Sequence, residues 1–123
     1  MNIDVDWDDD SQKIIRYTFH PGWTLTEFHQ VYDSVADMIR QAPGRVYGVI
    51  VDDTMNAPTP SGAIRAFSRT VQEGKLPLAI VGMNHVARVL MKVVEGTYHG
   101  ERQIYYAKTL DEARAALRHG AEK

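Results

Sequence analysis

The first part of the chain alternates between apolar and acidic residues. Within residues 1–7, apolar side chains alternate with Asp4 and Asp6, which is the two-residue period of a half-exposed strand. Turn-forming residues occupy positions 8–11, and the apolar stretch at 14–19 predicts a returning strand. The chain is therefore predicted to begin with an antiparallel hairpin.

A helix is predicted after this hairpin, from Thr24 to the Pro-Gly break at residues 43–44. Thr24 and Glu27 fit a capping box, in which each side chain satisfies a free backbone N–H at the start of the helix. Trp23 and Phe28 flank the box at the positions of a hydrophobic staple. Apolar residues then recur at helical spacing up to the break.

Two nearly continuous apolar runs occupy residues 46–51 and 76–81. Such runs are typical of strands that are covered on both faces of a sheet. Between them, Thr59 and Pro60 fit the N-cap and first position of a second helix, which is predicted to stop near Gly74.

The last third of the chain predicts a helix, a strand and another helix. The third helix is expected to open at residues 82–84 and to weaken across the segment 96–100. A strand is predicted at 103–107, and a second capping box at Thr109 and Glu112 introduces the final helix.

The predicted order is β-β-α-β-α-β-α-β-α within one domain that spans residues 1–123. Strands joined through helices need crossover connections and therefore run parallel. The sequence thus predicts an α/β fold with a single mixed, mostly parallel sheet and an antiparallel N-terminal hairpin. In particular, residues 46–51 and 76–81 are expected to form neighbouring parallel strands.

Composition narrows the functional classes. A chain of 123 residues with 44% hydrophobic content is sufficient for one core, and 14 basic residues against 16 acidic ones leave no basic surface of the kind nucleic acids require. There is no cysteine, and no apolar run approaches the roughly 18 residues of a membrane span. We therefore expect a cytoplasmic protein with no nucleic-acid partner, no membrane span and no cofactor.

Any binding site is expected where the parallel strands end. The loops after the carboxyl ends of such strands gather at one rim, where helix N-termini offer free N–H groups. The side chains predicted at this rim are His20, Trp23, Asp52, Asp53, Thr54, Thr59, Ser61, Asn84, His85, Lys108 and Thr109.

The segment Val-Ile-Val-Asp at residues 49–52 leads through a loop to Pro-Ser-Gly-Ala-Ile at 60–64. Together with the element order, this segment resembles the STAS domain of anti-sigma-factor antagonists and sulfate transporters. Ser61 stands where that family carries a phosphorylated serine, and Gly62 matches the glycine after it. Thr59 replaces the family's acidic residue and a proline replaces its first serine. The resemblance implies a non-catalytic regulatory module that binds a protein partner and is switched at the second helix.

Other interpretations of the same residues stay open. Ser61 also suits an ordinary first turn of a helix, where serine is common. The apolar helix stripes, and the STAS-like relatives that bind lipids, suggest a small-ligand or lipid-binding domain instead. Exposed helix faces also leave a homodimer open.

An enzyme would use Asp52, Asp53 and His85, since acid–base chemistry needs such groups in one pocket. The simpler interpretation makes the two aspartates a solvated pair that ends a strand, and His85 a surface residue that could contact an anion or a partner. The acidic residues between positions 4 and 10 are likewise interpreted as a solvated edge and turn. No metal site is expected, because the five histidines form no His-x-x-x-His pair.

Overall fold

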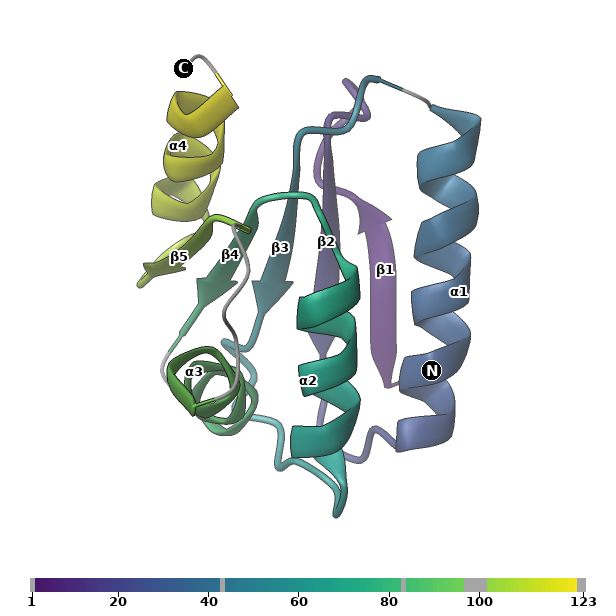
Figure 1. Ribbon diagram of the computed structural model, residues 1–123, viewed down its shortest axis with the longest axis vertical. Helices are drawn as coiled ribbons and strands as arrows, with labels where there is room; N and C mark the ends of the chain where they lie inside the picture. Colours follow the sequence, from purple (N-terminus) through teal and green to yellow (C-terminus); the bar gives the residue numbers. More distant parts are fainter. Residues whose placement is uncertain (1, 43, 83, 97–101, 122–123) are drawn as a thin grey trace.

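A computed structural model describes residues 2–42, 44–82, 84–96 and 102–121 of the chain. Its elements follow the predicted order (Figure 1). The strands are β1 (Ile3–Trp7), β2 (Ile14–Phe19), β3 (Gly48–Asp52), β4 (Leu78–Val81) and β5 (Ile104–Ala107). The helices are α1 (Leu25–Gln41), α2 (Ala63–Glu73), α3 (His85–Gly96) and α4 (Leu110–Ala121).

The five strands form a single mixed sheet in the order β1-β2-β3-β4-β5. Strand β1 runs antiparallel to β2, and each of the other neighbouring pairs is parallel. In the central pair, Val49 lies opposite Leu78 and Asp52 lies opposite Val81. The predicted α/β fold is confirmed, including the two parallel central strands and the N-terminal hairpin.

The helices are divided unequally between the two faces of the sheet. Alternate residues of β3 enter different clusters: Val49 and Val51 pack with α1, α2 and α3, whereas Ile50 packs with α4. Figure 1 shows α1 beside β1 and α4 beside β5, at opposite ends of the sheet. All five residues of β3 are buried, as expected for a strand that is covered on both faces.

In both predicted capping boxes the threonine caps the helix, but the glutamate does not accept from the N–H of that threonine. The Thr24 hydroxyl accepts a hydrogen bond from the Glu27 N–H, but the Glu27 carboxylate accepts from the N–H of Asn2 rather than of Thr24. At α4, Thr109 caps the N–H of Glu112, whose carboxylate accepts from the N–H of Lys108. Each glutamate therefore links its helix to the chain outside it.

Helix α2 begins later than the sequence predicts. Thr59 and Pro60 are not its N-cap and first residue, because the N–H of Ala63 donates to the carbonyl of Pro60 in a turn that precedes the helix. Gly62 is the N-cap and has a left-handed backbone with φ 88°, which a residue with a side chain rarely adopts. The left-handed residue ends the turn and sets the first helical position at Ala63.

Several predicted bounds shift by one or two residues. Strand β3 starts at Gly48 rather than at residue 46, and β4 starts at Leu78 rather than at 76, because Pro77 has no N–H to donate to the sheet. The predictions at residues 1, 43, 83 and 97–100 lie outside the described residues, and so does His99.

One aspartate of the N-terminal acidic segment is buried, contrary to the expected solvated turn. The side chain of Asp8 is only 2% exposed, and it accepts hydrogen bonds from Arg114 Nε at 2.7 Å, Arg114 Nη2 at 2.9 Å and Arg16 Nη1 at 3.0 Å. Arg114 belongs to α4. The ion-paired cluster therefore ties the last helix to the N-terminal hairpin.

Candidate binding pocket between helices

The predicted rim at the carboxyl ends of β3 and β4 forms, but its polar groups bind one another. Asp52 is 6% exposed, and its Oδ1 accepts hydrogen bonds from the N–H and the hydroxyl of Thr54, at 3.0 and 2.7 Å. The expected solvated pair is therefore wrong for Asp52. Its carboxylate shapes the turn that follows the strand.

Asp53 is fully buried, so the solvated interpretation is also wrong for this residue. Its Oδ2 accepts a hydrogen bond from the N–H of Ala87 at 3.0 Å, and Oδ1 is buried without a hydrogen-bond partner among the described residues. Burial raises the pKa of Asp53, against the lowering effects of the N–H groups of Ala87 and Val86 and of a charged His85. Asp53 thus caps α3 from a distant part of the chain.

The neighbouring rim residues have mixed roles. The Asn84 amide donates to the carbonyl of Asp53 at 3.2 Å, and His85 is exposed at the start of α3. His20 lies at the other side of the rim, where its Nε2 is 2.8 Å from a carboxylate oxygen of Asp4.

The sequence predicts Trp23 at the rim surface, but its side chain is buried in the core. It is only 3% exposed, and its ring stacks on Phe67 and meets the edge of Phe19. Its large apolar ring is stabilised by burial in an aromatic cluster, together with the predicted staple partner Phe28. Trp23 is therefore a core residue.

Ser61 is exposed in the turn before α2, and Thr59 is half-buried beside it. Two large apolar side chains of the same region are exposed: Met55 by 50% and Ile64 by 57%. This region is accessible to a partner. Lys108 and Thr109 are exposed beyond β5, before α4.

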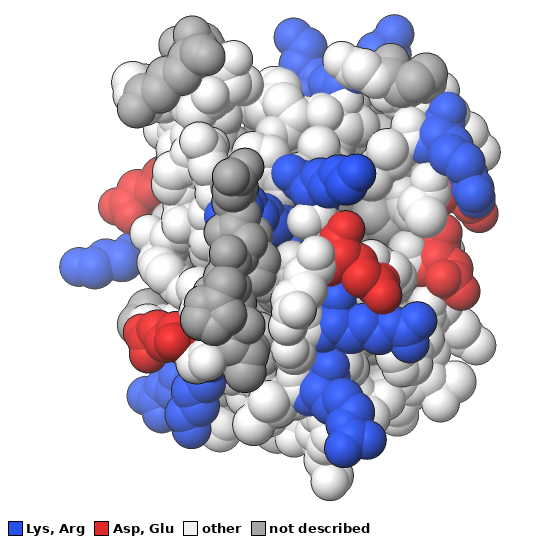
Figure 2. All heavy atoms as spheres, in the orientation of Figure 1, with Lys and Arg blue, Asp and Glu red and all other residues white. Residues whose placement is uncertain are grey.

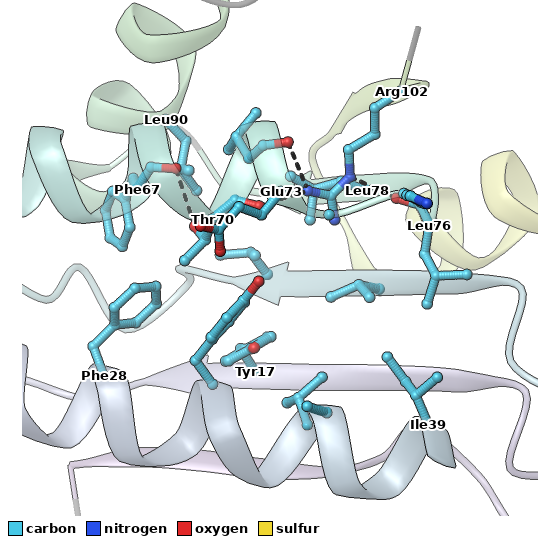
Figure 3. Close-up of a pocket in the computed structure, with 18 of the residues that line it drawn as sticks. Tyr17, Phe28, Ile39, Phe67, Thr70, Glu73, Leu76, Leu78, Leu90 and Arg102 are labelled. Atoms are coloured by element: carbon cyan, nitrogen blue, oxygen red, sulfur yellow. Dashed lines mark hydrogen bonds between the residues drawn. The ribbon is translucent and has the colours of Figure 1, made fainter. Parts of the chain in front are cut away.

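A pocket lies elsewhere, between α1 and α2, with strands β2, β3 and β4 contributing to its walls (Figure 3). Its volume is about 400 Å³, which lies within the range of small-molecule sites. Most of its walls are apolar side chains, including Phe28, Val35, Val51, Phe67 and Leu78. Ligand pockets are typically concave and lined mostly by apolar side chains, so a pocket of this size and composition is a candidate site.

Two tyrosines bring hydroxyl groups to this apolar pocket. Tyr17 comes from β2 and is buried, whereas Tyr32 comes from α1 and is half-buried. Burial raises the pKa of both tyrosines, and for Tyr32 the nearby Glu73 carboxylate raises it further. Both hydroxyl groups are therefore protonated near neutral pH, and the Tyr32 hydroxyl donates to the Glu73 carboxylate.

Arg102 is placed at one end of the pocket by backbone carbonyl groups. Its Nε donates to Leu76 at 2.6 Å, and its Nη1 donates to Thr70 and Val71 near the end of α2. A Cβ atom at Gly74 would lie only 2.4 Å from this Nη1, so glycine at this position makes room for the guanidinium group. The arginine therefore holds the end of α2 and supplies a positive charge beside the pocket.

Basic side chains also gather on the surface next to the pocket. Figure 2 shows Lys and Arg over α2 and the loop that follows it, where Arg65, Arg69 and Lys75 are exposed. Arg69 pairs with Glu73 at 3.0 Å. The basic groups on this side contrast with a net charge of −2 for the whole chain.

The pocket and the predicted rim share no residue. Sequence reasoning missed Tyr17, Tyr32 and Arg102, although the two tyrosines carried a signal. Each lies at an inward position of a predicted strand or helix and combines an apolar ring with a polar tip.

Among the described residues, no group of three or more His, Asp or Glu side chains is arranged to hold a metal ion. None of the helices in that part of the chain is both long and apolar enough to cross a membrane. Comparison with known proteins finds no matching family model, no matching curated protein and no matching solved structure.

Proposed function

We propose that this chain is a non-catalytic binding domain that takes up a small, mostly apolar molecule between α1 and α2. The observation that carries the proposal is the pocket of about 400 Å³ with its apolar walls. An apolar ligand would restore the contacts that the lining side chains lack in an open pocket. At liquid density this volume corresponds to roughly a dozen water molecules, so the ligand should have about as many non-hydrogen atoms.

A pocket-filling variant tests this proposal. Ala36 lies on α1, is exposed and lines the pocket, so a larger side chain can enter the space from its edge. Ala36→Phe is expected to abolish binding of 1-decanol in an NMR titration. Ala115→Phe, at an exposed alanine of α4, is the matched control and should bind like the wild type. Absence of decanol binding to the wild-type protein, or equal binding to Ala36→Phe, would refute the proposal.

A second candidate function is protein binding at the start of α2, in line with the STAS-like resemblance. It is favoured by the exposed Met55 and Ile64 in the region of Ser61. A phosphate on Ser61 would add about two negative charges beside this apolar surface and weaken an apolar contact.

Self-association is the simplest form of this second function to measure. In sedimentation velocity, Ile64→Glu and Ser61→Asp are then expected to shift a dimer toward monomer, whereas Ser61→Ala leaves it unchanged. A wild-type protein that is monomeric at every concentration would contradict a dimer through this surface.

A further inference from the structure

The pocket has an apolar end and a charged end. In Figure 3, Phe28 and Phe67 lie at one end, whereas Arg102 lies at the other, beyond Tyr17 and Glu73. A ligand that matches this arrangement has an apolar tail and a polar head.

The charges of the lining residues favour an anionic head. Among the described residues that line the pocket, three side chains are charged at neutral pH: Lys75 and Arg102 are positive and Glu73 is negative. The negative charge of Glu73 is further offset by Arg69, whose Nε lies 3.0 Å from its carboxylate. A single negative charge on the ligand would therefore be attracted, whereas a cation would be repelled by two of the three groups.

The two positive groups differ in how they can act. The Arg102 guanidinium is held in place by backbone carbonyl groups and keeps its charge at every physiological pH. The Lys75 side chain is exposed and forms no ion pair with the described residues, so its flexible ammonium group can move to a ligand. The Tyr17 hydroxyl group adds a hydrogen-bond donor between the two ends of the pocket.

We infer that the ligand is a monoanionic amphiphile of the medium-chain carboxylate type. Its carboxylate would lie toward Lys75 and Arg102, and its chain would lie toward Phe28 and Phe67. This inference rests on the proposed function, because it assigns the chemistry of the molecule that fills the same pocket. Decanoate, with about a dozen non-hydrogen atoms, matches the size worked out from the pocket volume.

Three probes with the same ten-carbon chain separate the effect of the head group from that of the tail. Decanoate, 1-decanol and decyltrimethylammonium are titrated below their micelle concentrations and followed by NMR of the protein. Decanoate is expected to bind roughly tenfold more tightly than the cation, which corresponds to about 1.4 kcal/mol. Decanol is expected to be intermediate, and rising salt should narrow the differences because the pocket is open to solvent.

Two lysine variants identify the group that recognises the head. Lys75→Gln should fold normally because the residue is exposed, and it should lose most of the preference for decanoate over decyltrimethylammonium. Lys92→Gln, at an exposed lysine of α3 outside the pocket, is the matched control and should keep this preference.

The outcomes separate failure of this inference from failure of the proposed function. If none of the three probes binds, the proposed function is wrong and the inference falls with it. If decanol or the cation binds as tightly as decanoate, or if Lys75→Gln keeps the preference, the pocket binds apolar ligands but the anionic head is wrong. Binding of decanoate to Ala36→Phe as tightly as to the wild type would place the ligand outside the pocket and also overturn the inference.

Discussion

Replacement of Asp8 tests how strongly the last helix is held to the N-terminal hairpin. The Asp8 side chain is 2% exposed, and its two arginine partners are 26% and 30% exposed. Removing one partner of a fully buried ion pair costs about 3–5 kcal/mol, whereas an exposed pair is worth less than about 1 kcal/mol. Because the two guanidinium groups can regain water when Asp8 is removed, we expect Asp8→Ala to lower the free energy of unfolding by about 2–3 kcal/mol.

Urea denaturation followed by circular dichroism measures this loss. In thermal unfolding it corresponds to a decrease in Tm of roughly 8–15 °C for a domain of this size. Asp37→Ala removes one partner of the exposed pair between Asp37 and Arg40 in α1, and this control should change stability by less than about 0.5 kcal/mol. A double-mutant cycle of Asp8→Ala with Arg114→Ala should give a coupling energy of about 1–2 kcal/mol. A coupling energy near zero would refute the idea that this pair anchors α4.

Three further substitutions test a buried carboxyl group, a close contact in the core and a helix cap. Because burial raises the pKa of Asp53 above 3.8, this group stabilises the fold most at low pH and loses its contribution as the pH rises through the raised pKa. Asp53→Asn should therefore flatten the plot of unfolding free energy against pH above about pH 4, and an unchanged profile would contradict the raised pKa. Gly48→Ala places a Cβ 2.9 Å from two methyl carbons of Leu117 and should cost about 1–3 kcal/mol in denaturant titrations, partly recovered by adding Leu117→Val. Thr24→Ala removes the hydroxyl cap of α1 and should cost about 1 kcal/mol by the same measurement, whereas no loss would show that the Glu27 N–H finds water instead.

The fold follows from local patterns to a large extent. The alternation in β1, the capping residue of α1 and the apolar runs of β3 and β4 each depend on residues close together in the chain, so the sequence predicts them. Predictions fail where the burial of a side chain or the start of a helix depends on a distant residue or on an unusual backbone conformation. The burial of Asp8 depends on Arg114, 106 positions away, and the late start of α2 depends on the left-handed conformation of Gly62.

The candidate site was harder to predict than the fold. The sequence predicts that Asp53 and Asn84 lie close together at the ends of β3 and β4, and they do. The hydrogen bonds of both residues, however, are made within the protein, to the Asp53 carbonyl and the Ala87 N–H. Polar residues at strand ends predict where side chains meet, without showing whether they are already satisfied by the backbone. A pocket depends on the distance between helices, which neither composition nor periodicity specifies.

The position of the pocket follows from the way the helices share the sheet. Helix α1 packs on β1 at one edge, whereas α2 packs against α3, so α1 and α2 are drawn toward different neighbours. Three helices on one face leave a gap between them over β2 and β3, where the sheet presents Tyr17, Val49 and Val51. Helix α1 presents a small side chain, Ala36, to this gap. A larger side chain at the same position would fill part of the gap. Because Ala36 is exposed and lines the pocket, a larger side chain at this position is expected to fill the gap without disturbing the buried core.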